Sequence, residues 1–218
     1  MNVLPPIYVI TLREDSYRRV ETQKHFDAQG LMVSWVQGVN GVAAGIASIV
    51  PHDSDLTGQR KYVHPTVLGT TISHLFALEL ALLHGAEEFF IMEDDVVLCD
   101  GFKDKWPVTR AAVPDDVDVI QLAVTSAEDK PSSPINDLLE HRYYPFCTTC
   151  NWWRRSAAEF AVKVLRPFNS PIDIMLMQRV YPFVGHAITI KPMAWDHSYH
   201  AKDGKWPRSV SPSDIYEV

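Results

Sequence analysis

The stretch FFIMEDDVVL, residues 89–98, joins an apolar run to three consecutive acidic residues. Phe89 to Met92 are all large and apolar, which is typical of a strand buried on both faces of a sheet. Carboxylates that follow such a strand repel one another, and their burial is costly unless a positive group lies near them. A divalent cation would supply that charge, and oxygen ligands at a strand end suit Mg²⁺ or Mn²⁺. A solvated acidic turn explains the same residues equally well, so both interpretations stay open.

Around this stretch, strand-like apolar runs alternate with amphipathic helix-like runs, which predicts an α/β fold. Strands are expected at residues 6–12, 32–36, 89–92 and 117–124. Helices are expected at 17–29, at 72–83 with Thr70 or Thr71 as its cap, at 156–165 with Ser156 and Glu159 as a capping box, and from 170–173 onward. Residues 38–68 and the tail from Trp195 are expected to be irregular. In such a sheet, ligands bind at the carboxyl ends of the strands.

Length and composition favour one globular domain spanning residues 1–218, because 46% of the residues are hydrophobic and 22% are charged. The net charge of −7 disfavours a general nucleic-acid binder. A local basic excess at 154–208 fits a phosphorylated small molecule, an anionic membrane surface or a solvated charged face. No secretion signal and no membrane span are recognised, since the longest apolar stretch is 75–83. A cytoplasmic protein is expected, with peripheral contact at the inner membrane face as an open alternative.

Two smaller patterns have alternative explanations. Cys147 and Cys150 have the CxxC spacing of zinc and redox motifs, but only His141 lies nearby as a further ligand, so ordinary reduced thiols are expected. Arg18 and Arg19 open the helix after the first strand. Their guanidinium groups can hold a nucleotide phosphate or stack on a base, although exposed arginines facing nearby acids would give the same pattern.

Four blocks in order extend the argument: PIYVITLREDSYRR at 6–19, GTTISH at 69–74, FFIMEDDVVL at 89–98 and SPID at 170–173. Together they resemble glycosyltransferase family 25, which includes bacterial lipooligosaccharide β-galactosyltransferases and the collagen galactosyltransferase domain. The resemblance implies a single-domain, Rossmann-like GT-A sheet with helices on both faces, with residues 1–100 as the nucleotide-sugar and metal half and 101–218 as the acceptor half. It also implies a UDP-hexose donor, usually UDP-galactose or UDP-glucose, Mn²⁺ or Mg²⁺, inversion at the anomeric carbon, and a lipid-linked or protein-linked glycan acceptor such as lipopolysaccharide.

The resemblance also implies roles for single residues. Glu93-Asp94-Asp95 resembles the family's form of the Asp-x-Asp metal motif, with Glu in first place. Asp95 is the expected metal ligand, Glu93 or Asp94 is expected to meet ribose or sugar hydroxyls, and Asp94 is a second candidate ligand. A late histidine, His197 or His200, could complete the metal site, although tail histidines are more often exposed and inert. The residues expected at the nucleotide are Thr11, Arg13, Arg18, Arg19, Ser73, His74 and Asp94. For His74, a hydrogen-bonded core position is the stronger alternative.

Inversion needs a base for the proton of the acceptor hydroxyl. Asp173, in the block that resembles the family's Pro-x-Asp, is the leading candidate, and Glu93 is the other catalytic carboxylate. Asp173 could instead only cap the first turn of its helix. Trp152 and Trp153 could stack on an acceptor sugar or pack in the core. Two rival functions stay open, a metal-dependent phosphoesterase and a binding module of the same fold without catalysis.

Overall fold

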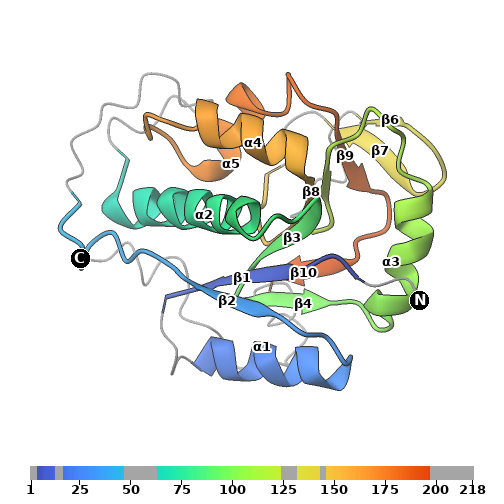
Figure 1. Cartoon of the computed structure of the whole chain (residues 1–218), viewed down its shortest axis with the longest axis horizontal. Helices are drawn as coiled ribbons and strands as arrows, with labels where there is room; N and C mark the ends of the chain where they lie inside the picture. Colours follow the sequence, from blue (N-terminus) through green and yellow to red (C-terminus); the bar gives the residue numbers. More distant parts are fainter. Residues whose placement is uncertain (1–3, 13–16, 47–62, 124–131, 143–145, 197–218) are drawn as a thin grey trace.

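The computed structural model describes residues 4–12, 17–46, 63–123, 132–142 and 146–196 (Figure 1). Its main sheet has the strand order β2-β1-β3-β8-β5-β9-β7-β6. The strands are β1 (Ile7–Thr11), β2 (Ser34–Gln37), β3 (Glu88–Glu93), β5 (Val119–Gln121), β6 (Ser132–Pro134), β7 (Leu139–Arg142), β8 (Cys150–Arg154) and β9 (His186–Thr189). A smaller sheet pairs β4 (Val96–Leu98) with β10 (Ala194–Asp196). The helices are α1 (Tyr17–Ala28), α2 (Pro65–Leu83), α3 (Phe102–Ala111), α4 (Arg155–Val164) and α5 (Ile172–Arg179).

Most of the central strands run in one direction. Strand β1 is parallel to β2 and to β3, and β5 is parallel to β9. Strand β8 is inserted between β3 and β5 and is antiparallel to both, so β3 and β5 point the same way. The carboxyl ends of β1, β3 and β5 therefore meet at one edge of the sheet, together with the beginning of β8.

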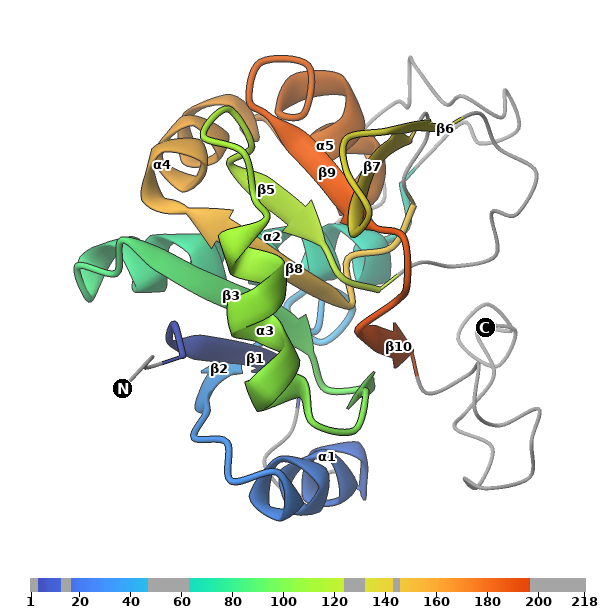
Figure 2. The ribbon, with the colours of Figure 1, turned by 90° about the vertical axis from the view of Figure 1, so that its right-hand side faces the viewer.

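Helices cover both faces of the sheet, which confirms the expected α/β class. One core contains side chains of α1 and α3 packed on one face, with Phe26, Phe102 and Trp106 fully enclosed. The other core contains side chains of α2, α4 and α5 on the opposite face. Figures 1 and 2 show α4 on one side of the strands and α1 on the other. Strand β3 is buried on both sides, as expected, because Phe89 packs in one core and Phe90 in the other.

The expected start of α2 was wrong. The helix begins at Pro65 rather than at residue 72, and His64 caps it by accepting the backbone N–H of Thr66 at 3.2 Å. The hydroxyl of Thr71 donates back to the carbonyl of Val67, as happens inside a helix. Small residues let the preceding chain approach this first part of the helix: a Cβ on Gly69 would lie 2.4 Å from the backbone oxygen of Val39.

Two further expectations were wrong, and one open alternative is decided. Helix α4 has no capping box, because Arg154 is its N-cap residue and Ser156 instead donates a hydrogen bond to Asp118 at 3.1 Å. The chain after Trp195 is not irregular throughout, since β10 continues to Asp196. Of the two alternatives for Trp152 and Trp153, packing in the core is confirmed, because both are buried in β8, one on each face of the sheet.

Helix α2 is long and apolar enough, by length and composition, to cross a membrane, and it is the one such helix in the described part of the chain. The apolar region is therefore longer than residues 75–83, the stretch expected from the sequence. Nine of its 19 residues are buried, and the helix packs against β1, β3, α4 and α5. Helix α2 is thus the central helix of one face of the sheet, which explains its apolar composition.

Candidate functional site

The acidic residues at the end of β3 lie where the strand order brings several polar side chains together. Thr11 is the last residue of β1 and Glu93 the last residue of β3, and these two strands are parallel neighbours. Asp94 and Asp95 form the turn that follows. The expectation of a polar cluster at the carboxyl edge of the sheet is therefore met by the geometry.

Asp94 and Asp95 share one arginine. The Nε atom of Arg18 lies 3.5 Å from Oδ1 of Asp94, and its Nη2 atom pairs with Oδ2 of Asp95. Thr11 donates its hydroxyl to Oδ2 of Asp94 at 2.8 Å, and Thr22 of α1 donates to the Asp94 carbonyl at 2.7 Å. Burial raises the pKa of Asp94 above its ordinary value, although Arg18 and the Thr11 hydrogen bond oppose the shift. Helix α1 thus supplies the positive charge that the acidic turn requires.

Glu93 points to the other side of the same edge, towards α2. Its Oε1 atom lies 3.1 Å from Nε2 of His74 and accepts the hydroxyl of Thr148 at 2.6 Å. Burial acts to raise the pKa of Glu93, but these two hydrogen bonds, with the charges of His74 and Arg18, hold the pKa below its ordinary value. The Glu93 backbone N–H also donates to the carbonyl of Thr149. Glu93 is therefore a fixed, ionised carboxylate.

Asp173 approaches this cluster from the first turn of α5. The hydroxyl of Thr71 on α2 donates to the carbonyl of Ser170 at 3.2 Å, which fixes the segment leading into α5. One oxygen of Asp173 accepts the backbone N–H of Ile174 at 2.8 Å. Burial and the neighbouring charge of Glu93 raise the pKa of Asp173, while the Ile174 N–H and His74 act against the shift. Glu93 and Asp173 are thus two carboxylates in one cluster whose pKa values are shifted in opposite directions, a pattern found at catalytic sites.

Comparison with known proteins identifies the family. A model of glycosyltransferase family 25, described as an LPS biosynthesis protein, matches residues 4–151. The chain belongs to glycosyltransferase family 25. The matched region contains the whole acidic turn with Arg18, His74 and Glu93, whereas Asp173 lies beyond it. The protein is a glycosyltransferase, and membership of the family implies a nucleotide-sugar donor and a glycan acceptor.

The fold is shared with a solved structure at low sequence identity. A glycosyltransferase involved in glycosylation of the major capsid of PBCV-1 is 10% identical, with a TM-score of 0.51 over 97% of this chain and 98% of that chain. TarS from S. aureus is 13% identical, with a TM-score of 0.48 over 97% of this chain and 62% of that chain. No protein with a curated description matches the sequence. The GT-A type fold expected for a family 25 enzyme is confirmed.

Other residues expected at the nucleotide have different surroundings. The guanidinium of Arg19 stacks 4.7 Å above the ring of Trp35 in β2. The Ser73 hydroxyl is buried, accepts the N–H of Val39 at 2.7 Å and donates to the carbonyl of Gly69. Ser73 therefore anchors the chain that follows β2. Arg13, His197 and His200 lie outside the described residues, so their predicted roles stay predictions.

A metal site was also expected at the acidic turn. Within the described ranges, no three His, Cys, Asp or Glu side chains gather as a ligand group. Asp94 and Asp95 would still suffice as the protein ligands of an Mg²⁺ ion. Mg²⁺ is commonly held by one or two carboxylates together with substrate phosphates and water. Strand β10 brings Asp196 beside Val96, which directly follows Asp95, and the chain then leaves the described part. Among the described residues, neither Cys147 nor Cys150 forms a disulfide bond.

Three polar residues at this edge were missed by sequence reasoning. Thr148 holds Glu93, while Gln121 at the end of β5 and Asn151 in β8 each carry a buried side-chain oxygen without a hydrogen-bond partner among the described residues. A polar residue inside an apolar strand was the available signal, in VIQL at 119–122 and in CNWW at 150–153. That signal was weak, because the pairing that brings Gln121 and Asn151 beside Glu93 is long-range.

Proposed function

We propose that this family 25 glycosyltransferase transfers galactose from UDP-galactose to a hydroxyl group of a glycan, with inversion at the anomeric carbon. One observation carries the proposal: the Asp94–Asp95 turn with its arginine adjoins a separate cluster of Glu93, His74 and Asp173. With a divalent cation bound, the turn and its arginine are suited to a charged diphosphate, and the cluster is suited to the proton transfer of a group-transfer reaction. The family description as an LPS biosynthesis protein supports a saccharide of lipopolysaccharide as the acceptor.

The donor diphosphate would bind at the acidic turn. Arg18, which contacts both carboxylates, is placed to meet the same diphosphate, since a guanidinium group forms paired hydrogen bonds with phosphate oxygens. Asp95 and Asp94 would hold Mn²⁺ or Mg²⁺, with His197 as a third proposed ligand. When bound, the ion stabilises the negative charge that develops on the leaving diphosphate. Thr11 orients Asp94 through its hydrogen bond. Arg19, which stacks over Trp35, follows Arg18 in α1, the helix that comes after β1.

The transfer itself requires a proton acceptor. The acceptor hydroxyl oxygen forms a bond to C1 of the hexose, the bond from C1 to the diphosphate oxygen breaks, and its electron pair leaves with UDP. The proton of the hydroxyl passes to the carboxylate of Asp173, whose raised pKa makes it a stronger base than an ordinary aspartate. Glu93, held ionised by His74 and Thr148, would accept hydrogen bonds from sugar hydroxyls and stabilise positive charge developing on the ring.

The proposed place of action is the cytoplasm, with contact at the inner face of the membrane where a lipid-linked acceptor would be found. The support is the basic excess of residues 154–208, part of which is on α4 and the loop after it, at Arg155, Lys163 and Arg166. Arg155 and Arg166 also form ion pairs with Glu159 and Glu79. These pairs neutralise part of that basic excess.

Release of sugar into water tests both the donor and the stereochemistry. The full chain is incubated with UDP-galactose or UDP-glucose and Mg²⁺, which is diamagnetic, and proton NMR follows the anomer released first. The donor is an α-linked sugar, so an inverting enzyme releases the β anomer before mutarotation. Binding of UDP-galactose without any release or transfer would instead support the non-catalytic binding module, and early release of the α anomer would contradict inversion.

A further inference from the structure

Two buried amide side chains lie in neighbouring strands beside Glu93. Gln121 and Asn151 are directly opposite each other in the β5–β8 pair, and each is 1% exposed. Asn151 is also opposite Ile91 of β3, so Glu93, two residues further along β3, is its diagonal neighbour on the same face. The residues adjacent to the two amides, Ile120 and Trp152, pack in the core of α1 and α3. The amides therefore face the side of α2 and α5, where Asp173 and His74 lie.

The orientation of the Gln121 amide is determined by its partners. Its Nε2 group donates to the backbone carbonyls of Phe146 at 2.9 Å and of Cys147 at 2.5 Å, and only the NH₂ end of the amide can donate. The oxygen, Oε1, must then point away from that segment, and it is buried with no hydrogen-bond partner among the described residues. The Oδ1 atom of Asn151 is also buried and has no hydrogen-bond partner among the described residues. Buried acceptors without a partner are rare in native proteins and destabilise them.

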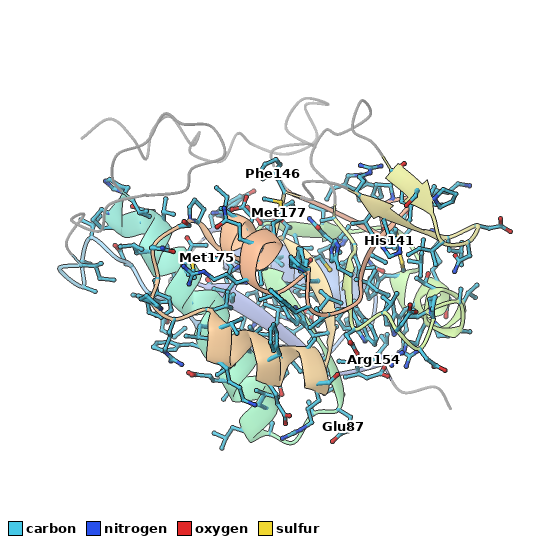
Figure 3. The ribbon with its side chains drawn as sticks, turned by 90° about the horizontal axis from the view of Figure 1, so that it is seen from above. Glu87, His141, Phe146, Arg154, Met175 and Met177 are labelled. Atoms are coloured by element: carbon cyan, nitrogen blue, oxygen red, sulfur yellow. The ribbon has the colours of Figure 1, made fainter. Side chains whose placement is uncertain are left out.

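The backbone beside these amides is strained as well. Cys147 has φ of 106°, a conformation that residues other than glycine seldom adopt, and its carbonyl is one of those held by Gln121. The next residue, Thr148, is the one that holds Glu93. In the view of Figure 3, Phe146, which precedes Cys147, lies on the opposite side of the molecule from Glu87, the residue before β3. Backbone strain beside unpartnered buried acceptors is typical of a binding site.

We propose that Oε1 of Gln121 and Oδ1 of Asn151 accept hydrogen bonds from hydroxyl groups of the donor hexose and hold the sugar over Glu93. The inference rests on the proposed function, because the hexose is attached to the diphosphate assigned to Asp94 and Asp95. Amide oxygens repel phosphate and carboxylate groups, so their natural ligand is a hydrogen-bond donor such as a hydroxyl group. Two buried acceptors on neighbouring strands would also distinguish sugars by the positions of those hydroxyl groups.

Asn151 provides the cleaner test, because its side chain forms no hydrogen bond within the described ranges. Leucine has nearly the same shape, so Asn151→Leu removes the unpartnered oxygen without removing a contact. The matched control is Thr189→Val. Thr189 at the end of β9 also carries a buried hydroxyl without a partner in the described structure, but it lies opposite Leu139, which belongs to the other core. The measurements are the melting temperature and the dissociation constants of UDP and UDP-galactose in the presence of Mn²⁺.

The wild-type chain and Thr189→Val should bind UDP-galactose more tightly than UDP. Asn151→Leu should bind UDP unchanged, lose about tenfold in affinity for UDP-galactose, and melt at the same or a higher temperature. An unchanged preference for UDP-galactose in Asn151→Leu would overturn the inference and leave the proposed function standing. If Asn151→Leu does not fold, Asn151→Ala is judged by the same ratio of affinities. Failure of the wild-type chain to bind either ligand would overturn the proposed function, and this inference with it.

Discussion

At the scale of single residues, the hydrogen bond from the Thr148 hydroxyl helps His74 to lower the pKa of Glu93. Thr148→Val keeps the shape of the side chain but removes its hydrogen bond to the Glu93 carboxylate, so the pKa of Glu93 should rise. We expect the free energy of unfolding at pH 7 to fall by about 1 to 3 kcal/mol, the range for hydrogen bonds to charged groups. Because the Glu93 pKa is lowered in the folded state, this difference is present above pH 4.5 and is lost as the pH falls through the lowered value.

Urea unfolding from pH 7 down to pH 3 measures this difference. The control is Thr149→Val, since the neighbouring hydroxyl of Thr149 is close to Cys147 rather than to Glu93. A Thr148→Val effect that stays constant across this pH range would show that the hydroxyl acts on packing alone and not on the Glu93 charge.

A second residue, Asp173, should determine how the activity falls as the pH is lowered. Asp173→Asn is expected to lower kcat by about 100- to 10,000-fold, the usual range for loss of a general base. In the wild-type chain, kcat/KM should decline as the pH falls through the Asp173 pKa, which is raised above 3.8 by burial and by Glu93. The same substitution removes a buried charge beside Glu93, so the melting temperature at pH 7 should not decrease. A folded Asp173→Asn chain with wild-type kcat would exclude Asp173 as the base.

At the scale of elements, the first turns of α2 depend on glycine. A Cβ on Gly69 would lie 2.4 Å from the Val39 oxygen and 2.7 Å from the Gly41 nitrogen, both backbone atoms that cannot rotate away. Gly69→Ala should therefore destabilise the protein by about 2 to 3 kcal/mol through overpacking, although alanine favours helices. Thr70→Ala, one residue further on, is the control and should change stability by less than about 1 kcal/mol. Chemical denaturation compares the two, and equal stabilities would show that the chain after β2 does not pack against α2 as described.

Some helices and strands could be predicted from the sequence, and others could not. Strands β1 and β3 and helix α1 were predictable, because each has a strong local pattern and a polar residue at its end. The start of α2 was not, since His64 is an unusual N-cap residue and small polar residues interrupt the apolar pattern of its first turns. Strand β8 was missed because its antiparallel insertion between β3 and β5 depends on long-range pairing, which leaves no local signature. Thr148, Gln121 and Asn151 were missed with it.

At the scale of the whole molecule, the fold places the Asp94–Asp95 turn and the cluster of Glu93, His74 and Asp173 on opposite sides of one strand end. Arg18 from α1 serves Asp94 and Asp95, while α2 and α5 bring His74 and Asp173 to Glu93. Both layers of helices are therefore needed to build one site. The acidic residues and their position at the sheet edge were predictable, whereas the division of their roles required the tertiary structure.

The proposed function requires the acidic turn, with its metal ion, to bind the donor diphosphate. Isothermal titration of UDP into the full chain, with and without Mn²⁺, tests it most directly, using Asp95→Asn as the variant and the exposed Asp100→Asn as the matched control. We expect Mn²⁺ to increase the affinity for UDP in the wild-type chain and in Asp100→Asn. In Asp95→Asn, Mn²⁺ should no longer increase the affinity for UDP. Equal UDP affinity in all three proteins, with no response to Mn²⁺, would contradict the claim.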